Sequence, residues 1–355
     1  MLSHDRRAFL AGGTATLASA FAHPPAARAR STSRLIDVHH HMIPPPYLKY
    51  NRRAIISGAD VDPTPVLSWR ASSMIEAMDL NGIAVAMLSM SSPGISMLGG
   101  TRDQIRKLAR ACNEYAASLR RAHPGRLGHF AAVPMPDVAG ALTETTYALD
   151  VLKSDGIELY TNYRGTYLGE PSFKPLFAEL NRRKAVVFVH PTEPRCCSTE
   201  LPQIEPSLLE YYFDTTRAIA SLLYNGTLAA NPDIRFIFAQ AGGALPSLAQ
   251  RMIAWSERHH PFGNVNIHGV SHELQKLYFD TASSANDRAI ASIMTVTSSS
   301  QIVFGSDSPY VSGASAVAGM EALHVSGDVR AAIERGNAQR LFPRLSVQPR
   351  ASHAP

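Results

Sequence analysis

The sequence predicts a closed (β/α)₈ TIM-type barrel of the α/β class, and three observations support that prediction. Short apolar runs alternate with amphipathic helical patterns along the chain, as is typical of parallel βα units. Eight such units follow one another within about 300 residues, the number that closes a barrel. No G-x-G-x-x-G follows the first apolar run, which disfavours the alternative of an open, dinucleotide-binding sheet.

Each predicted strand is a nearly continuous apolar run, because helices cover parallel sheets. The predicted strands are 34–39, 83–89, 127–133, 156–161, 185–190, 234–240, 277–281 and 301–307. The helical patterns lie around 71–80, 102–122, 138–153, 173–183, 205–230, 244–258, 286–297 and 315–324. No internal repeat or linker divides the chain. We therefore expect one barrel domain over 30–345 and a disordered tail over 346–355.

The first residues resemble an export signal rather than part of the fold. Arg6 and Arg7 precede a short apolar run rich in small residues, and an A-x-A site ends at Ala29. This order is typical of a twin-arginine signal peptide, here residues 1–29. We expect export to the periplasm, by a route that carries folded proteins and often a cofactor.

Composition excludes several classes of protein. The formal net charge is +5, but no Lys/Arg block or aromatic-basic stripe predicts a nucleic-acid partner. No segment after the signal has the roughly 20 apolar residues of a membrane helix. The three cysteines, Cys112, Cys196 and Cys197, do not form a disulfide framework.

Chemistry in a barrel is found where strands end and loops begin. The polar residues at the predicted strand ends are His39 and His41, His190, Gln240, Asp280 and Asp307. Side chains alternate along a strand, so His39 and His41 share a face and His40 points the other way. Three imidazoles and a carboxylate suit one divalent metal, zinc or manganese, with an open position. As alternatives, the histidine pair could lie in an exposed loop, and Asp280 and Asp307 could cap helices.

Four motifs resemble one known family. "DVHHH", "VFVHPTEP", "AGGALP" and "VFGSDSPY" occur in that order, as in the amidohydrolase-2 branch of the metal-dependent hydrolase superfamily. The most similar group contains aminocarboxymuconate-semialdehyde decarboxylase and the salicylate, resorcylate and 6-methylsalicylate decarboxylases. The resemblance implies a mononuclear metal, usually zinc, whose ligands are His39, His41, His190 and Asp307. It also implies a homodimer.

Two departures from the family pattern affect the expected chemistry. The family usually has H-x-G-G after its sixth strand, whereas this chain reads "QAGG", so Gln240 replaces a catalytic histidine. A glutamine donates and accepts hydrogen bonds, but it takes no proton near neutral pH. One family arginine that binds the substrate carboxylate across a dimer interface corresponds to Arg251. A second corresponds to Pro65 if Trp69 matches a family tryptophan, so a monocarboxylate or neutral ligand is expected.

Other candidate substrate-binding residues lie near the catalytic end of the barrel. Asn162, Tyr163 and Arg164 in "TNYRG" follow the fourth strand, although an ordinary turn explains them equally well. Trp69 could form an aromatic wall or pack at a helix entry. Asp280 could line the site or support a ligand.

The resemblance and the residues leave three functions open. The first is a metal-dependent, non-oxidative decarboxylase of a small, hydroxylated aromatic carboxylic acid, in which Asp307 delivers the proton. The second is a metal-dependent hydrolase of an ester, lactone or amide, which the loss of histidine at position 240 weakens. The third is a catalytically weakened barrel that acts as a binding protein, for which Gln240 is the only support.

Overall fold

The computed structural model describes residues 35–57, 63–95, 100–197, 201, 203–259 and 268–345. The predicted signal peptide, 1–29, and the predicted tail, 346–355, lie outside these residues. Across the described part of the chain, none of the helices has the length and apolar character needed to span a membrane.

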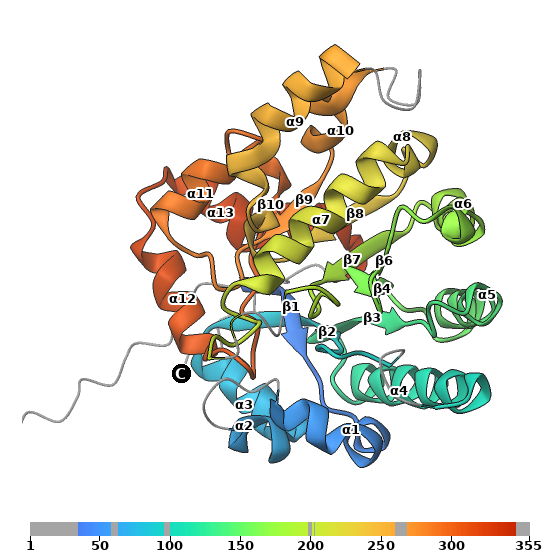
Figure 1. Ribbon diagram of the computed structural model, residues 1–355. Coiled ribbons are helices and arrows are strands. Elements are labelled where there is room, and N and C mark those ends of the chain that lie inside the picture. Colours follow the sequence, from blue (N-terminus) through green and yellow to red (C-terminus); the bar gives the residue numbers. More distant parts are fainter. Residues whose placement is uncertain are drawn as a thin grey trace, which may run out of the picture.

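The eight predicted strands are all present and form one parallel sheet (Figure 1). In sheet order they are β1 (Leu35–His41), β2 (Ile83–Ser89), β3 (Leu127–Ala132), β4 (Gly156–Tyr160), β7 (Val186–His190), β8 (Arg235–Phe238), β9 (Tyr278–Asp280) and β10 (Ile302–Val303). A small antiparallel hairpin, β5 (Asn162–Tyr163) with β6 (Thr166–Tyr167), follows β4. The strand order follows the chain order, as a singly wound barrel requires.

Backbone hydrogen bonds between β1 and the segment after β10 close the barrel. The N–H of Val38 donates to the carbonyl of Phe304 at 2.9 Å, and the N–H of His41 donates to the carbonyl of Ser308 at 2.7 Å. His40 and Ser308 also pair in parallel. The closure brings the end of the eighth strand beside the end of the first, where the sequence places Asp307 and the histidines. The barrel prediction is therefore confirmed.

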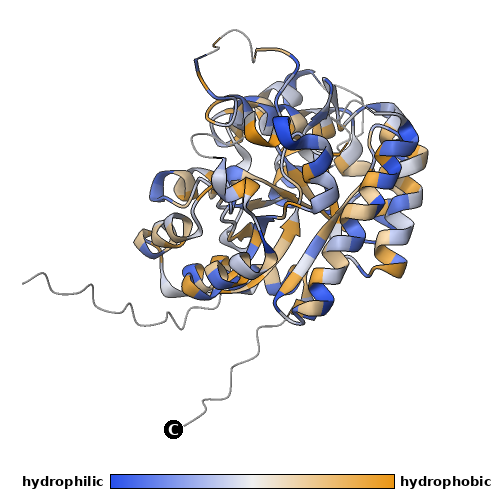
Figure 2. Ribbon diagram, turned by 90° about the horizontal axis from the view of Figure 1, so that it is seen from below, coloured by the Kyte–Doolittle hydropathy of each residue, from blue (hydrophilic) through white to orange (hydrophobic). Residues whose placement is uncertain are grey.

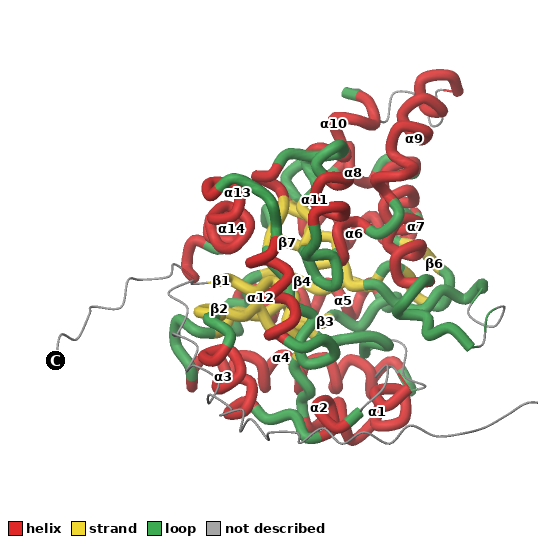
Figure 3. The backbone as a smooth tube through the Cα atoms, turned by 90° about the vertical axis from the view of Figure 1, so that its left-hand side faces the viewer, coloured by secondary structure: helices red, strands yellow, loops and turns green. Residues whose placement is uncertain are grey.

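Helices surround the strands (Figures 1 and 3). The helices carry both hydrophobic and hydrophilic residues (Figure 2), and many of their apolar residues are buried in the core. The α-helices are α1 (Pro45–Ser57), α2 (Thr64–Leu67), α3 (Ala71–Leu80), α4 (Arg102–Ala122), α5 (Val138–Thr146), α6 (Lys174–Arg182), α7 (Glu210–Tyr224), α8 (Thr227–Ala230), α9 (Leu245–His259), α10 (Gly269–Gln275), α11 (Asp287–Ile293), α12 (Gly313–Ala322), α13 (Gly327–Ala331) and α14 (Asn337–Leu341).

Two of the predicted helices differ in detail from those observed. The pattern over 205–230 becomes α7 and α8, because Gly226 adopts the left-handed conformation (φ 73°) between them, which glycine tolerates without strain. The pattern over 138–153 becomes α5 followed by a π-helical turn, Tyr147–Val151. The helices α1, α2, α10, α13 and α14 were not predicted from the sequence.

An apolar floor lies beneath the predicted metal ligands. The ring of Phe188 on β7 lies edge-on to the His39 imidazole, with centroids 5.0 Å apart, and stacks on Phe130 of β3 at 5.2 Å. Phe130 in turn meets Phe342, which follows α14. The lower barrel is therefore filled with side chains, and polar chemistry is confined to the carboxyl ends of the strands.

Candidate metal centre

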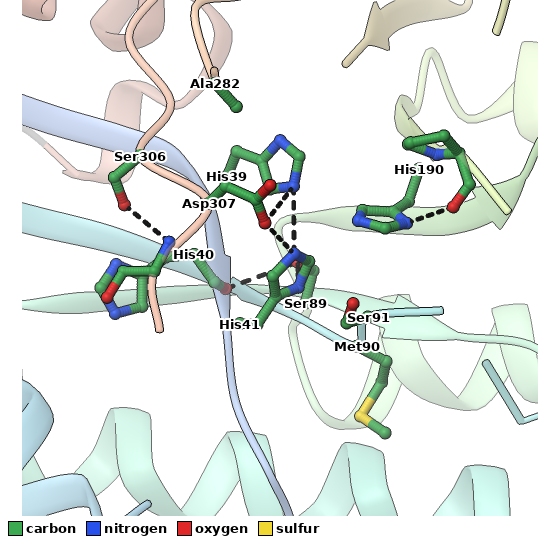
Figure 4. A network of polar contacts seen from close by, with 12 residues as sticks. His39, His40, His41, Ser89, Met90, Ser91, His190, Ala282, Ser306 and Asp307 are labelled. Atoms are coloured by element: carbon green, nitrogen blue, oxygen red, sulfur yellow. Dashed lines mark hydrogen bonds and ion pairs between the residues drawn. The ribbon is translucent and has the colours of Figure 1, made fainter. Parts of the chain in front are cut away.

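His39, His41, His190 and Asp307 converge at the carboxyl ends of β1, β7 and β10 (Figure 4). One potential ligand atom from each residue lies within 4.8 Å of those of the other three. The three histidines are buried, whereas the Asp307 side chain is 13% exposed. The four residues come from opposite sides of the barrel, so only the closed fold brings them together.

Hydrogen bonds at Nδ1 leave the Nε2 atom of each imidazole available to a metal. Nδ1 of His39 lies 2.8 Å from Oδ2 of Asp280, and Nδ1 of His190 lies 2.6 Å from its neighbour's carbonyl, that of Pro191. Both partners are acceptors, so Nδ1 carries the proton. Nδ1 of His41 lies 3.1 Å from Oγ of Ser89, whose hydroxyl donates to the His40 carbonyl. Such contacts orient metal-binding histidines.

The spacing of the ligand atoms fits a cation between them. Nε2 of His39 and Nε2 of His41 are 3.0 Å apart, and Oδ1 of Asp307 lies 3.4 Å and 3.1 Å from them, respectively. In the metal-free protein one of these ring nitrogens donates a hydrogen bond to the other, and a cation that displaces the shared proton would lie between them. Tetrahedral zinc with bonds of about 2.0–2.1 Å places neighbouring ligands roughly 3.4 Å apart. The donor set and its spacing therefore suit one divalent ion.

The charges in the site differ among the three histidines. Burial alone lowers the pKa of His39, but the carboxylates of Asp280 and Asp307 outweigh burial and raise it to about 9. Burial, and then the neighbouring imidazoles, hold the pKa values of His41 and His190 well below the usual range. In the metal-free protein, His39 therefore carries a proton that metal binding must displace.

Asp37 fixes the position of Asp307 from beneath. Its carboxylate accepts hydrogen bonds from the backbone N–H of Ser306 at 3.0 Å and from the Ser306 hydroxyl at 2.5 Å. It also lies 2.8 Å from Nδ1 of His40. This network holds the turn in which Asp307 adopts a left-handed backbone (φ 63°). As expected from alternation, His40 points away from the ligands and is not among them.

The ligands open into a cavity of about 590 Å³. Its walls include three phenols, Tyr211, Tyr212 and Tyr310, and its described lining residues include no lysine or arginine. The Tyr310 ring lies edge-on to that of His41, with centroids 5.4 Å apart, and burial raises the pKa of its hydroxyl. Tyr310 is therefore a neutral hydrogen-bond donor at the metal centre.

Gln240 and Asp280 lie where the sequence predicted, at the ends of β8 and β9. Gln240 lines the cavity and is only 4% exposed. Asp280 is fully buried: its Oδ2 meets His39, and its Oδ1 accepts from the backbone N–H of Gln240 at 2.9 Å. Asp280 thus supports a metal ligand rather than lining the cavity.

The remaining predicted substrate-binding residues do not line this cavity. Asn162 is fully buried, and its amide donates to Asp214 on α7 at 2.7 Å. The Tyr163 hydroxyl accepts from the backbone of Tyr160 within the core. The structure gives both residues a scaffold role in place of substrate contact, and Arg164 beside them is exposed.

Trp69 and Arg251 also lie outside the cavity lining. Trp69 is half-buried and packs near Tyr115, with ring centroids 6.4 Å apart. Arg251 is exposed on α9, so any contact with substrate requires a second subunit and stays a prediction.

Sequence reasoning missed several residues that line the cavity. Ser91, Ser92, Tyr211, Tyr212, Ser283 and Tyr310 all do so. Tyr310, Ser283, Ser91 and Ser92 had a usable signal, because each lies within three residues of a strand end or of a predicted site residue. Tyr211 and Tyr212 lie at the start of α7, which begins 20 residues after β7 ends at His190. The hydrophobic period of the sequence does not show that this helix start returns to the cavity.

Comparisons with known proteins agree with this geometry. The family model described as "Amidohydrolase" matches residues 36–344. The chain is 36% identical over 333 residues to "Decarboxylase yanB" of Aspergillus niger, covering 88% of each chain. It is 33% identical to 6-methylsalicylic acid decarboxylase of Penicillium expansum, covering 87% of this chain and 96% of the relative.

A solved structure shares the fold. The dihydroxybenzoic acid decarboxylase from Polaromonas, crystallised with manganese and an inhibitor, superposes with a TM-score of 0.78 at 18% identity, covering 89% of this chain and 98% of that one. Because the family model spans nearly all described residues and the two relatives named above exceed 30% identity over most of the chain, the chain belongs to the amidohydrolase family.

Proposed function

We propose that the protein is a metal-dependent, non-oxidative decarboxylase of a small, hydroxylated aromatic carboxylic acid. The observation that carries this proposal is the convergence of three imidazoles and Asp307 at the floor of a cavity large enough for one aromatic ring. Relatives with 33–36% identity over most of the chain are named decarboxylases, which favours this chemistry over hydrolysis.

The reaction assigns distinct tasks to the chain's own residues. When bound, a divalent ion supplies positive charge that holds the substrate carboxylate and stabilises developing negative charge. With substrate in the cavity, Asp307 takes up a proton from solvent and adds it to the ring carbon that bears the carboxylate. The carbon–carboxylate bond then breaks, CO₂ leaves, and the electron pair of that bond restores the aromatic ring.

The charge of the cavity limits the substrate to a single carboxylate. Its described lining has no cationic side chain, and its acidic members, Glu205 and Asp307, repel anions. A second carboxylate would be buried beside these acids with nothing to neutralise it, which is strongly unfavourable. The tyrosines instead offer neutral hydrogen bonds and aromatic contact to an uncharged part of the ring.

We propose zinc as the metal, because imidazole and carboxylate groups are common zinc ligands and a zinc ion held by these four groups can become five-coordinate when substrate binds. Manganese is the alternative, since it also accepts nitrogen and oxygen ligands and occupies the structurally similar Polaromonas decarboxylase. Metal analysis of the protein purified without added metal distinguishes the two.

We also propose that the protein is exported to the periplasm through its twin-arginine motif and acts as a homodimer. The support is the order of the signal features in residues 1–29 and the family resemblance. N-terminal sequencing of the secreted protein and its mass in solution test these two points. N-terminal sequencing is expected to show cleavage after Ala29.

The main experiment uses the metal-loaded protein and a panel of monocarboxylic hydroxybenzoates, beside a panel of lactones and esters. Release of CO₂ with an equal amount of the corresponding phenol supports the proposal. Hydrolysis of a lactone or ester without CO₂ release would support the hydrolase alternative instead. Metal retention without turnover of either panel would favour a binding protein.

A further inference from the structure

Two adjacent cysteines lie at the surface, in the loop that follows the metal ligand His190. Cys196 is exposed and Cys197 is partly buried. The third and last cysteine of the chain, Cys112 on α4, is fully buried, and burial raises the pKa of its thiol to about 12. The thiolate, not the thiol, is the reactive form of cysteine. Cys112 is therefore inert, and the adjacent pair holds the accessible thiols of the protein.

The segment that leads to the pair has a fixed position on the barrel. The backbone N–H of Thr192 donates to the Thr161 hydroxyl, which follows β4, at 3.1 Å. Gly165, in the β5–β6 hairpin, packs against Arg195, because a Cβ atom on this glycine would lie 3.3 Å from that of Arg195. The cysteines belong to the turn that begins at Arg195. The fold therefore presents both thiols from a defined turn.

The backbone of this turn sets the relative directions of the two thiols. Cys197 has a left-handed conformation (φ 78°), which is uncommon for a residue with a side chain. This φ is one of the two backbone torsions that separate the two side chains. A hydrogen bond to the Cys196 sulfur, and then burial, raise the pKa of Cys197. Cys197 therefore keeps its proton, and the exposed Cys196 is the thiol that a reagent meets first.

A guanidinium beside the pair favours negative charge on sulfur. Burial lowers the pKa of Arg217 on α7, but Tyr167, Cys196 and other nearby acidic groups raise it above its usual range. Its Nη1 atom is buried and makes no hydrogen bond in the described part of the chain, and the carboxylates of Glu210 and Asp214 lie 3.8 Å and 3.9 Å from it. A positive charge next to a thiol promotes the thiolate, which is the form that attacks disulfides.

We propose that Cys196 and Cys197 form a reversible redox site, at which a small-molecule disulfide such as oxidised glutathione converts the two thiols to a vicinal disulfide. The Cys196 thiolate attacks one sulfur of the reagent, whose S–S bond breaks, and the released thiolate takes a proton from solvent. The Cys197 thiol then loses its proton, and its sulfur attacks that of Cys196 and expels the second half of the reagent. The two cysteines are oxidised, and one reagent disulfide is reduced to two thiols.

The adjacency of the two residues makes the disulfide quick to close and easy to reduce. The second step joins neighbouring residues, so it is intramolecular and needs no encounter. Adjacent Cα atoms are about 3.8 Å apart, whereas disulfides usually join Cα atoms about 4.4–6.8 Å apart. The ring is therefore strained, and because it encloses no other residue it removes little entropy from the unfolded chain. Strained, exposed disulfides are labile rather than structural.

The test treats the purified protein with oxidised glutathione, blocks the remaining free thiols, and determines peptide masses. We expect the peptide that holds the pair to lose two hydrogen atoms and to retain no glutathione, while Cys112 is blocked only after denaturation. Cys196→Ser and Cys197→Ser are the matched controls. Each has a single accessible thiol and cannot close the ring, so each should keep one glutathione bound as a mixed disulfide.

Glutathione that stays attached to the pair in the parent, or a disulfide that links two chains, would overturn the proposal. A large excess of reduced glutathione should then restore both thiols of the oxidised parent, and a pair that stays oxidised would contradict a reversible site. Peptide masses do not depend on bound metal, on turnover or on export. A protein that releases no CO₂ from any hydroxybenzoate would therefore contradict the proposed function and leave this inference intact.

Discussion

Oδ2 of Asp280 lies 2.8 Å from Nδ1 of His39, and both side chains are fully buried. The contact fixes the His39 tautomer and raises its basicity, so that Nε2 faces the other ligands. The other oxygen of the same carboxylate, Oδ1, accepts a hydrogen bond from the backbone N–H of Gln240. One buried carboxylate therefore orients a metal ligand and a residue of the substrate cavity together.

Replacing Asp280 should weaken metal binding without removing a ligand. Asp280→Asn keeps the size of the side chain but removes the charge that favours an Nδ1 proton on His39. We expect a loss of about 10- to 100-fold in metal affinity, measured by competition with a chelator of known affinity. Glu205→Gln is the control, because it removes a carboxylate of the cavity wall that is not among the charged groups acting on His39. Equal losses in both variants would mean that overall negative charge, rather than orientation, governs affinity.

Removal of a ligand should abolish stoichiometric metal binding. The parent is expected to hold about one ion per chain, and His190→Ala and Asp307→Ala should each hold much less, measured by plasma mass spectrometry. Metal that binds only the folded state also stabilises it by about 2.7 kcal/mol at a hundredfold excess over Kd. A chelator should therefore lower the melting temperature of the parent by several degrees and barely affect either variant. A folded parent without metal, even after zinc or manganese is supplied, would contradict the metal centre.

The Ser306 hydroxyl should stabilise the turn that carries Asp307. It donates to Asp37 at 2.5 Å and accepts from the N–H of Ser308 at 3.1 Å, and the serine is fully buried. Ser306→Ala removes both contacts and leaves Asp37 short of one donor. We expect a loss of about 1–3 kcal/mol in the free energy of unfolding, measured by urea denaturation of the metal-free protein. Ser283→Ala, which alters an exposed serine of the cavity wall, should change it by less than about 0.5 kcal/mol.

Much of this architecture could be read from the sequence, because strands and their ends follow simple rules. Alternation along β1 separated His39 and His41 from His40, and chain order placed Asp307 beside them once the barrel closed. The loops follow no comparable period. Asn162 has the polarity of a substrate ligand, yet it binds Asp214, a partner 52 residues away that no local pattern reveals. Tyr211 and Tyr212 reach the cavity only because α7 packs across it.

His129 on β3 should make the protein less stable in acid, independently of the metal centre. Its side chain is fully buried. Burial, reinforced by the positive charges of Arg120 and Arg344, lowers its pKa from 6.5 to about 3. Nδ1 has no hydrogen-bond partner, whereas Nε2 lies 2.7 Å from the Ser154 hydroxyl. The native protein therefore holds this imidazole neutral.

The sign of the effect follows from proton counting. Below pH 6.5 the unfolded chain binds a proton at this histidine that the native protein does not, so stability falls as the pH falls. The loss is about 1.4 kcal/mol for each pH unit between 6.5 and about 3. His129→Gln has no titrating ring there, so the difference in unfolding free energy between parent and variant should shrink progressively from pH 7 to pH 5, measured by urea denaturation. A difference that stays constant over this range would show that His129 titrates normally in the native protein.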